Sequence, residues 1–232
     1  MRILIDVRVL GRGGISGIEE YTRELVDALL TIDEKNDYLL FANSFRKTGP
    51  LPEEWLRHPR VRVVNWHIPN KLLEASMRFF GFPSIDRLLS VHLVLSPHFT
   101  FLKTVRAPRV VTFHDLAFLH HPDFFNIRQK IWHWSQDYRN QATHAAHLIA
   151  VSEFTKHDLM ESLKVSARTI TVIYSGIHHR FHTIPRHDVR LEQFRNDRGL
   201  HAPFVLSLGT LEPRKNIEAV IRAFTLLKQE QR

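Results

Sequence analysis

The stretch Gly11-Arg12-Gly13-Gly14-Ile15-Ser16-Gly17-Ile18-Glu19-Glu20-Tyr21 decides the fold of the N-terminal part of the chain. A short apolar run, residues 3–6, precedes it and is typical of a buried strand. Apolar residues then recur at steps of three and four, which predicts a helix over residues 18–30. A strand, a glycine-rich turn and a helix in this order form an anion-binding unit, because glycines admit a ligand close to backbone N–H groups.

The spacing of the glycines does not by itself say which anion is bound. It matches neither the Gly-x-Gly-x-x-Gly turn of dinucleotide-binding proteins nor a P-loop, which ends in Lys followed by Ser or Thr. The dinucleotide fingerprint also needs an acidic residue after the second strand, but residues 38–41 run into Ala42 and Asn43. Glycines that only close the turn remain the alternative. Ser16 and Glu19 have the spacing of a capping box, which would begin the helix here.

The composition is that of a globular protein, since 44% of the 232 residues are hydrophobic and 24% are charged. The absence of cysteine excludes disulfide frameworks and thiolate metal sites. The net charge of +8 and the pI of about 10.0 favour an anionic partner. The basic residues are scattered and form no stripe, which argues against nucleic acid. The strand pattern begins directly after Met1 and no apolar run could span a bilayer, so we expect no signal peptide and a cytoplasmic location.

Strand-like apolar runs alternate with helical patterns along most of the chain. We predict strands at residues 3–6, 38–41, 61–65, 92–96, 110–113, 148–151 and 171–174. We predict helices at residues 18–30, about 72–80, 127–146, 154–163 and 188–196. This alternation predicts an α/β fold with a doubly wound, Rossmann-like parallel sheet, in which ligands bind outside the carboxyl ends of the strands.

Residues 70–89 allow two interpretations. Their apolar residues are interleaved with basic ones such as Lys71 and Arg78. A basic amphipathic segment of this kind can lie on a membrane surface. It can equally form a core-facing helix that ends at Gly81 and Pro83, which is the interpretation that we favour.

The character of the chain changes after a first domain of residues 1–177. Residues 178–203 are polar and charged, and we interpret them as a linker between domains. A new strand pattern, residues 204–208, then leads through a turn into a helix at residues 217–228. This repeats the plan of the N-terminus, so residues 204–232 are predicted to begin a second Rossmann-like domain that is incomplete.

Three segments carry candidate side chains for chemistry. His114-Asp115 follows a central predicted strand, where a histidine can bind a substrate hydroxyl or move a proton near neutral pH. A histidine that only packs there against Asp115 is an equally good interpretation. Ser152 ends another strand and is better explained as the N-cap of the next helix. Arg214 and Lys215 lie in a turn that opens a helix, a position that suits a diphosphate.

The sixteen histidines form no recognisable metal motif. Their nearest groupings, His120-His121 and His178-His179-x-x-His182, lack two histidines four residues apart with a glutamate between them. We therefore expect no functional metal. The Gly-x-Ser-x-Gly elbow of a serine nucleophile is absent as well.

Five segments of the chain carry a family resemblance. They are residues 13–25, 112–115, 151–155, 172–177 and 208–216, and the last, Leu208-Gly209-Thr210-Leu211-Glu212-Pro213-Arg214-Lys215-Asn216, is the most specific. Together they resemble the family 4 nucleotide-sugar glycosyltransferases, which have the GT-B fold. The resemblance is strongest to mannosyltransferase-like members that build bacterial surface polysaccharide.

The resemblance implies two Rossmann-like domains that face each other across a cleft, with the acceptor bound by the first. It implies retaining transfer of a hexose from a nucleotide sugar, with GDP-mannose as the leading donor and with no metal or other cofactor. The acceptor would be a saccharide or a lipid-linked saccharide, with a peripheral membrane contact and no nucleic acid partner. The resemblance implies His114 as catalytic and Gly14, Gly17 and Lys215 as donor-binding. From their positions in the sequence we add Asp115 as catalytic, Arg214 as donor-binding, and Ser152 and Glu153 as acceptor-side candidates.

Three features depart from the family pattern, and the first is Ser175-Gly176-Ile177-His178 in place of the usual Asn-Gly-Ile/Val-Asp turn. Thr210 stands where many members have an arginine, and the family's C-terminal Glu-x7-Glu region would lie beyond Arg232. We therefore expect the 232-residue chain alone to be inactive. The alternatives are an NAD-dependent oxidoreductase, against which the missing acid after the second strand argues, and a non-catalytic basic domain that binds an anionic lipid or a sugar phosphate.

Overall fold

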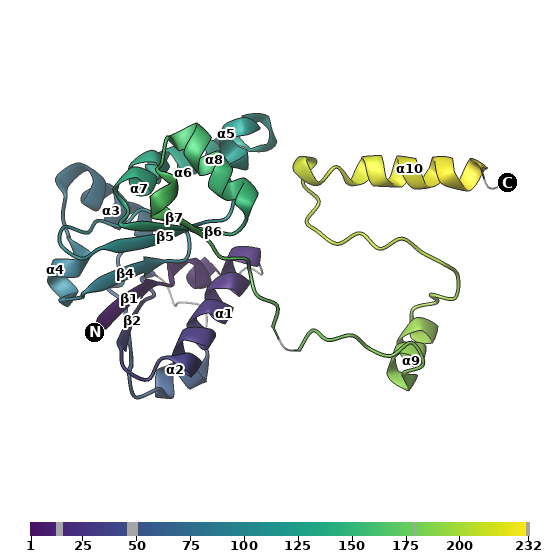
Figure 1. Cartoon of the computed structure of the whole chain (residues 1–232), viewed down its shortest axis with the longest axis horizontal. Coiled ribbons are helices and arrows are strands. Elements are labelled where there is room, and N and C mark those ends of the chain that lie inside the picture. The colour runs from purple at the N-terminus through teal and green to yellow at the C-terminus, as the bar shows by residue number, and fades with distance from the viewer. Residues whose placement is uncertain (13–15, 46–50, 179, 231–232) are drawn as a thin grey trace. The chain divides into compact units, whose positions relative to one another are not determined.

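The computed structural model describes residues 1–12, 16–45, 51–178 and 180–230. The described chain divides into two units, one of Met1–His120 with Ile127–Gly176 and one of His121–Asn126 with Ile177–Arg232. The first unit is a parallel sheet with helices on both faces (Figure 1). The predicted α/β fold with a Rossmann-like parallel sheet is therefore confirmed.

The sheet has seven parallel strands in the order β3-β2-β1-β4-β5-β6-β7. The strands are β1 (Arg2–Asp6), β2 (Asp37–Phe41), β3 (Val61–Val64), β4 (Leu93–Ser96), β5 (Arg109–Phe113), β6 (His147–Ala150) and β7 (Ile170–Val172). Each lies where the sequence predicts a strand, with small shifts at the ends. The chain reverses the direction in which it adds strands between β1 and β4, and ligands of such sheets bind at the carboxyl ends near this point.

Ten α-helices accompany the strands within the described residues. They are α1 (Gly17–Ile32), α2 (Glu53–Arg57), α3 (Asn70–Ala75), α4 (Ile85–Leu89), α5 (Ala117–His120), α6 (Ile127–Ser135), α7 (Tyr138–His144), α8 (Glu153–Leu163), α9 (Val189–Asp197) and α10 (Ile217–Glu230). Ser16 accepts a hydrogen bond from the backbone N–H of Glu19 at 3.3 Å, so it caps α1 as predicted.

Alternate residues of β1 point to opposite faces of the sheet, and both faces are covered. Leu4 belongs to a buried cluster with residues of α3 and α4, whereas Ile3 and Ile5 belong to another with residues of α1 and α2. A third cluster joins β5, β6 and β7 to α7 and α8. This double burial explains why the strands read as continuous apolar runs.

The single helix predicted at residues 127–146 is in fact two helices, α6 and α7. The chain turns at Asp137, whose φ of 50° lies in the left-handed region that a continuous helix does not use. The break buries the amide of Gln136, whose oxygen accepts a hydrogen bond from the backbone N–H of Phe101 at 2.7 Å. The turn therefore supports the loop that joins β4 to β5.

Residues 70–89 combine features of both interpretations that the sequence allows. Helix α3 continues into one π-helical turn, Ser76–Phe80, which ends at Gly81 in the left-handed conformation. Leu73 and Met77 are buried in the core, as we favoured. However, Phe79 and Phe80 are 70% and 84% exposed, so the core interpretation is wrong for this end of the segment. The widened turn rotates the following side chains out of the stripe that faces the sheet.

The second unit contains α9 and α10. Both helices lie where the sequence predicts them, but residues 204–208 are not part of a strand. A strand needs a hydrogen-bonded neighbour, and the described part of the second unit offers none. Within the described residues, no helix has the length and the apolar character needed to cross a membrane.

Candidate active site

His114 lies directly after β5, at the carboxyl edge of the sheet. Its Nε2 is 2.9 Å from the carbonyl oxygen of Pro97, which follows the neighbouring strand β4. A carbonyl can only accept, so we assign the ring proton to Nε2. Nδ1 of the neutral ring is then an acceptor, able to bind a substrate hydroxyl.

Tyr21 brings α1 to the same edge. Its ring meets the ring of His114 edge to face, with centroids 4.8 Å apart and planes at 88°. The Tyr21 hydroxyl is also 3.4 Å from Oγ1 of Thr112 in β5. The helix that follows the glycine-rich turn is therefore fixed against the strand that carries His114.

Two further rings extend this arrangement along the edge. The ring of His98 lies 5.9 Å from that of His114, and it stacks on Trp132 at 5.7 Å with the planes 6° apart. Trp132 belongs to α6. Such an aromatic wall can pack against the apolar faces of a sugar ring.

Burial lowers the pKa of His114, although the hydrogen bond to Pro97 and the charge of Asp115 oppose this shift. The imidazole of His114 is therefore neutral at pH 7 and is harder to protonate than an ordinary histidine, whose pKa is 6.5. As pH falls through that value, an unfolded histidine gains a proton before His114 does. Acidification then favours unfolding, so this residue reduces stability at low pH.

Asp115 does not act as the partner that the sequence suggested for His114. Its carboxylate is exposed and accepts a hydrogen bond from the backbone N–H of Ala117 at 3.0 Å, at the start of α5. This arrangement gives Asp115 a clear structural role, and its negative charge still reaches His114. A catalytic role for Asp115 remains a prediction.

Ser152 is the N-cap of α8, as we expected. Its Oγ accepts from the backbone N–H of Thr155 at 3.0 Å, while Oγ1 of Thr155 donates to the carbonyl oxygen of His114 at 3.2 Å. The cap therefore ties α8 to the catalytic candidate. Glu153 is the first residue of α8 and is exposed to solvent, where an acceptor could reach it.

The two glycines assigned to the donor are Gly17 and Gly14. Gly17 is the exposed first residue of α1, and a Cβ added to it would meet no atom within 4 Å. This open helix N-terminus is able to receive an anion. Gly14 lies outside the described residues, so its donor role stays a prediction.

Arg214 and Lys215 belong to a short 3-10 turn, Pro213–Lys215, in the second unit. Nε of Arg214 donates to Glu212 at 2.6 Å, and this bond lowers the pKa of the Glu212 carboxyl. Lys215 makes no ion pair or hydrogen bond through its ammonium group to the residues described. Of the two cations, Lys215 is therefore the more available for a diphosphate.

Among the residues that the structure describes, no group of three or more His, Asp or Glu side chains could hold a metal ion. His120 instead pairs with Asp158, with Nε2 and Oδ1 2.6 Å apart.

A model of Glycosyltransferase Family 4 matches residues 15–181, which is most of the chain. The chain belongs to glycosyltransferase family 4. Over 83 residues this family 4 chain is also 31% identical to the serotype-specific mannosyltransferase WbdA of Escherichia coli. That segment is 36% of this chain and 10% of WbdA.

Solved structures of Anabaena Alr3699/HepE share the fold of this family 4 chain. The complex with UDP-glucose has a TM-score of 0.53 at 19% identity. The match covers 88% of this chain and 51% of the HepE chain. The complex with UDP and glucose has a TM-score of 0.52 at 18% identity. That match covers 86% of this chain and 50% of the HepE chain. The family 4 chain thus spans about half the length of HepE, and its match to WbdA covers about a tenth of that protein.

The sequence analysis assigned no site role to several residues that the structure places there, namely Tyr21, Pro97, His98, Trp132 and Thr155. Pro97 and His98 do follow a predicted strand, which is a usable signal, since carboxyl ends gather on one edge. Tyr21 lies on the predicted helix, but the helical pattern does not show which strand it contacts. Trp132 reads as an ordinary apolar residue of a helix.

Proposed function

We propose that this chain is the acceptor-side half of a retaining glycosyltransferase. The observation that supports this best is the neutral His114, which offers Nδ1 as an acceptor at the carboxyl edge, beside the helix that follows the glycine-rich turn. An imidazole in this state suits a hydroxyl of the donor sugar. The open N-terminus of α1 suits the diphosphate of the same donor.

The donor in this proposal is a nucleotide-activated hexose, with mannose from GDP-mannose first among the candidates. Similarity to a mannosyltransferase supports mannose, whereas the HepE structures contain UDP and glucose or UDP-glucose. Lys215 binds the diphosphate, and the leaving phosphate helps to deprotonate the acceptor hydroxyl on the same face of the sugar. The acceptor is a saccharide or a lipid-linked saccharide of surface polysaccharide, and the reaction takes place in the cytoplasm without a metal.

Replacement of His114 provides the main test. In a protein that joins this chain to a complete family 4 second domain, His114→Ala should lower kcat at least about 100-fold, because a positioned acid–base or hydrogen-bonding group contributes roughly 10²–10⁴-fold. The measurement is transfer of radiolabel from GDP-mannose, UDP-glucose and UDP-galactose. The unmodified protein should keep its kcat as pH is lowered past 6.5, the usual pKa of histidine, because burial lowers the pKa of His114.

The control for this test is His157→Ala, which removes an exposed histidine paired with Glu161 on α8. It should leave kcat unchanged. Equal activity of both variants would show that His114 is not part of the active site. Binding of NAD in preference to every nucleotide sugar would instead support the oxidoreductase alternative.

Lys215→Ala is expected to raise the donor KM or lower kcat about tenfold or more in the same joined protein. A charge-assisted hydrogen bond is worth roughly 1.5–3 kcal/mol, and about 1.4 kcal/mol corresponds to tenfold. Steady-state kinetics over a range of donor concentrations measures both constants. The matched control is Lys228→Ala, on α10. Unchanged donor kinetics in the Lys215 variant would contradict its assignment.

The proposed membrane contact involves an aromatic–basic patch, which we define as Lys71, Arg78, Phe79, Phe80, Arg128, Ile131 and Trp134. Most of these residues line one recess between α3, the π-helical turn and α6. Arg78 joins the two sides, since its guanidinium lies 4.8 Å from the Trp134 ring and donates to the carbonyl oxygens of Trp134 and Ser135 at 2.9 and 2.6 Å. Trp134 is 65% exposed.

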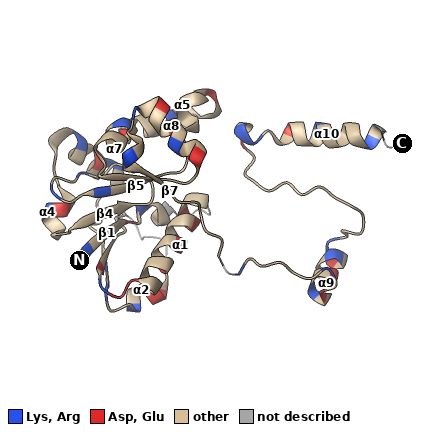
Figure 2. Ribbon diagram, in the orientation of Figure 1, with Lys and Arg blue, Asp and Glu red and all other residues tan. Residues whose placement is uncertain are grey.

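This combination suits an anionic lipid surface. Exposed aromatic rings can enter the headgroup region, and basic residues near an anionic surface contribute about 1 kcal/mol each. Figure 2 shows Lys and Arg interspersed with Asp and Glu along much of the ribbon. The proposal therefore depends on this local patch and not on the overall charge of +8.

The 232-residue chain is expected to sediment with vesicles that contain phosphatidylglycerol, and much less with phosphatidylcholine alone. Phe79→Ser combined with Phe80→Ser should weaken vesicle binding at least about tenfold, since burial of one phenylalanine contributes roughly 1.5–3 kcal/mol. Phe154→Ser, which changes an exposed phenylalanine on α8, is the control. Equal binding by all three proteins would show that the patch does not contact lipid.

A further inference from the structure

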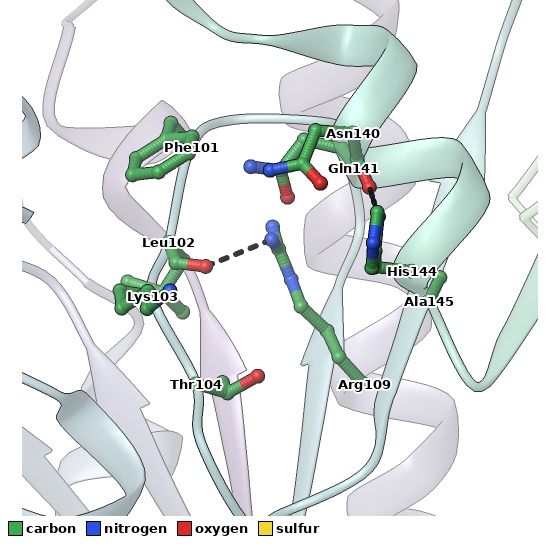
Figure 3. Close-up of a pocket in the computed structure, with 9 residues that line it drawn as sticks. All are labelled: Phe101, Leu102, Lys103, Thr104, Arg109, Asn140, Gln141, His144 and Ala145. Atoms are coloured by element: carbon green, nitrogen blue, oxygen red, sulfur yellow. Dashed lines mark hydrogen bonds between the residues drawn. The ribbon is translucent and has the colours of Figure 1, made fainter. Parts of the chain in front are cut away.

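A second recess lies away from the candidate active site, where β5 begins and α7 ends. It has a volume of about 190 Å³. Its walls come from the loop that joins β4 to β5, from Arg109 at the start of β5 and from the last turn of α7 (Figure 3). His114 follows the opposite end of β5, so the recess and the candidate active site are separated by the length of that strand.

Arg109 forms the floor of this recess and carries an incompletely compensated charge. Only 6% of the residue is exposed. Its guanidinium donates to Oγ of Ser96 at 2.9 Å and to the carbonyl oxygens of Thr100 and Leu102 at 2.7 and 3.0 Å. All three acceptors are neutral, and a guanidinium has five N–H donors, so two remain.

The environment of Arg109 is unfavourable for its positive charge. Burial lowers the pKa of Arg109 to about 9, the charge of Asp6 opposes this shift and the charge of Arg8 adds to it. At pH 7 the group is nevertheless still protonated. A buried cation of this kind gains free energy when an anion is placed beside it.

Gln141 of α7 faces the same space. It is 6% exposed, and its Oε1 is buried without a hydrogen-bond partner in the described part of the chain. Figure 3 shows the guanidinium of Arg109 directed toward the amide side chains of Asn140 and Gln141. A buried amide oxygen without a partner costs about 1–3 kcal/mol, so a ligand or water that donates to it would stabilise the site.

The rim adds further groups of suitable chemistry. Lys103, Thr104 and His144 lie around the opening, and none of the residues that line the recess is acidic. Lys103 makes no ion pair among the described residues. The recess therefore has two cations, two amides and a hydroxyl, which are groups that can hold phosphate in proteins.

We propose that this recess binds a phosphoryl group whose oxygens accept hydrogen bonds from Arg109 and Lys103. A hydroxyl of the phosphate, or of the sugar to which it is esterified, donates to Oε1 of Gln141. The site is distinct from the donor diphosphate site of the proposed function and does not depend on it. Free phosphate and a phosphorylated sugar share this chemistry. A recess that holds only ordered water is the competing explanation, because its volume admits several water molecules.

The test is calorimetric titration of the 232-residue chain with inorganic phosphate and, separately, with glucose 6-phosphate. Gln141→Leu should weaken binding about tenfold, or 1.4 kcal/mol, and Lys103→Gln at least about threefold. Leucine fills the place of an amide that makes no hydrogen bond in the described chain, so this variant should fold normally. Lys35→Gln, at an exposed position, is the charge-matched control and should bind phosphate like the unmodified chain.

Three outcomes would overturn the proposal. The first is no binding of either probe by the unmodified chain, which would leave a water-filled recess. The second is equal weakening by Lys103→Gln and Lys35→Gln, which would indicate attraction by net charge alone. The third is binding that His114→Ala abolishes and Gln141→Leu does not change, which would place the phosphate at the candidate active site. Tighter binding of glucose 6-phosphate than of phosphate would support the proposal with an ester as the ligand.

Discussion

The 232-residue chain alone is expected to transfer sugar at least about 1,000-fold more slowly than a protein that joins it to a complete family 4 second domain. A single helix N-terminus contributes roughly 0.3–1 kcal/mol, and at most about 2, toward an anion. Because tenfold in affinity requires about 1.4 kcal/mol, this terminus cannot hold a nucleotide sugar at useful concentrations. In the proposed function, the remaining binding energy comes from the second domain of the joined protein.

The second unit, as described, does not supply such a domain. Residues 204–208 have no paired strand, and the apolar side chains Val220, Ile221, Phe224 and Leu227 of α10 are exposed. We expect this apolar face to cause self-association, which sedimentation velocity would detect.

The activity measurement is transfer of radiolabel from GDP-mannose and other nucleotide sugars, by the 232-residue chain and by the protein that joins it to a complete second domain. Similar rates for the two would refute the prediction.

Replacement of Asp6 by alanine is expected to lower the free energy of unfolding by about 3–5 kcal/mol, the usual cost of removing one partner of a buried ion pair. Both oxygens of Asp6 accept from the buried Arg8, at 2.8 and 2.7 Å. The same guanidinium donates to Glu74 at 3.2 Å and to the carbonyl oxygen of Phe101 at 2.9 Å. Without Asp6, the buried charge of Arg8 would keep only one carboxylate.

Urea unfolding, monitored through tryptophan fluorescence, measures this loss of unfolding free energy. The matched control is Glu53→Ala, which breaks an exposed pair between Glu53 and Arg57 on α2. That change should cost no more than about 1 kcal/mol, because exposed pairs contribute little. A loss below 1 kcal/mol in the Asp6 variant would show that the buried network contributes less than its geometry suggests.

The sheet could be predicted from the sequence because each strand is a short apolar run between helical patterns. Burial on both faces produces this signal in the central strands such as β1, and the edge strands β3 and β7, which are partly exposed, are still short β-branched runs. The division between α6 and α7 could not be predicted in this way. It depends on the left-handed conformation of Asp137 and on the contact of Gln136 with a distant loop, and helical periodicity contains neither.

The site was predictable in part. His114 could be located because it follows a central strand, and Ser152 because it precedes a helix. The contact of Tyr21 with His114 and that of Thr155 with the same residue join segments far apart in the sequence. The strand order decides which of these segments meet, and a single sequence does not contain that order. The interpretation of residues 70–89 failed for Phe79 and Phe80 because a π-helical turn changes the spacing on which it relied.

The attachment of His114 on three sides has a consequence for the cost of binding. Pro97 holds its Nε2, Tyr21 meets its ring and Thr155 binds its backbone carbonyl. The first two contacts restrict the ring and the third fixes the backbone that carries it, so the side chain has little freedom left to lose when a ligand binds. The loss of rotamer entropy, about 0.5–1.5 kcal/mol for a mobile side chain, is therefore incurred during folding and not during binding. The imidazole is preorganised, so in the proposed function Nδ1 would accept from a sugar hydroxyl without a further change of rotamer.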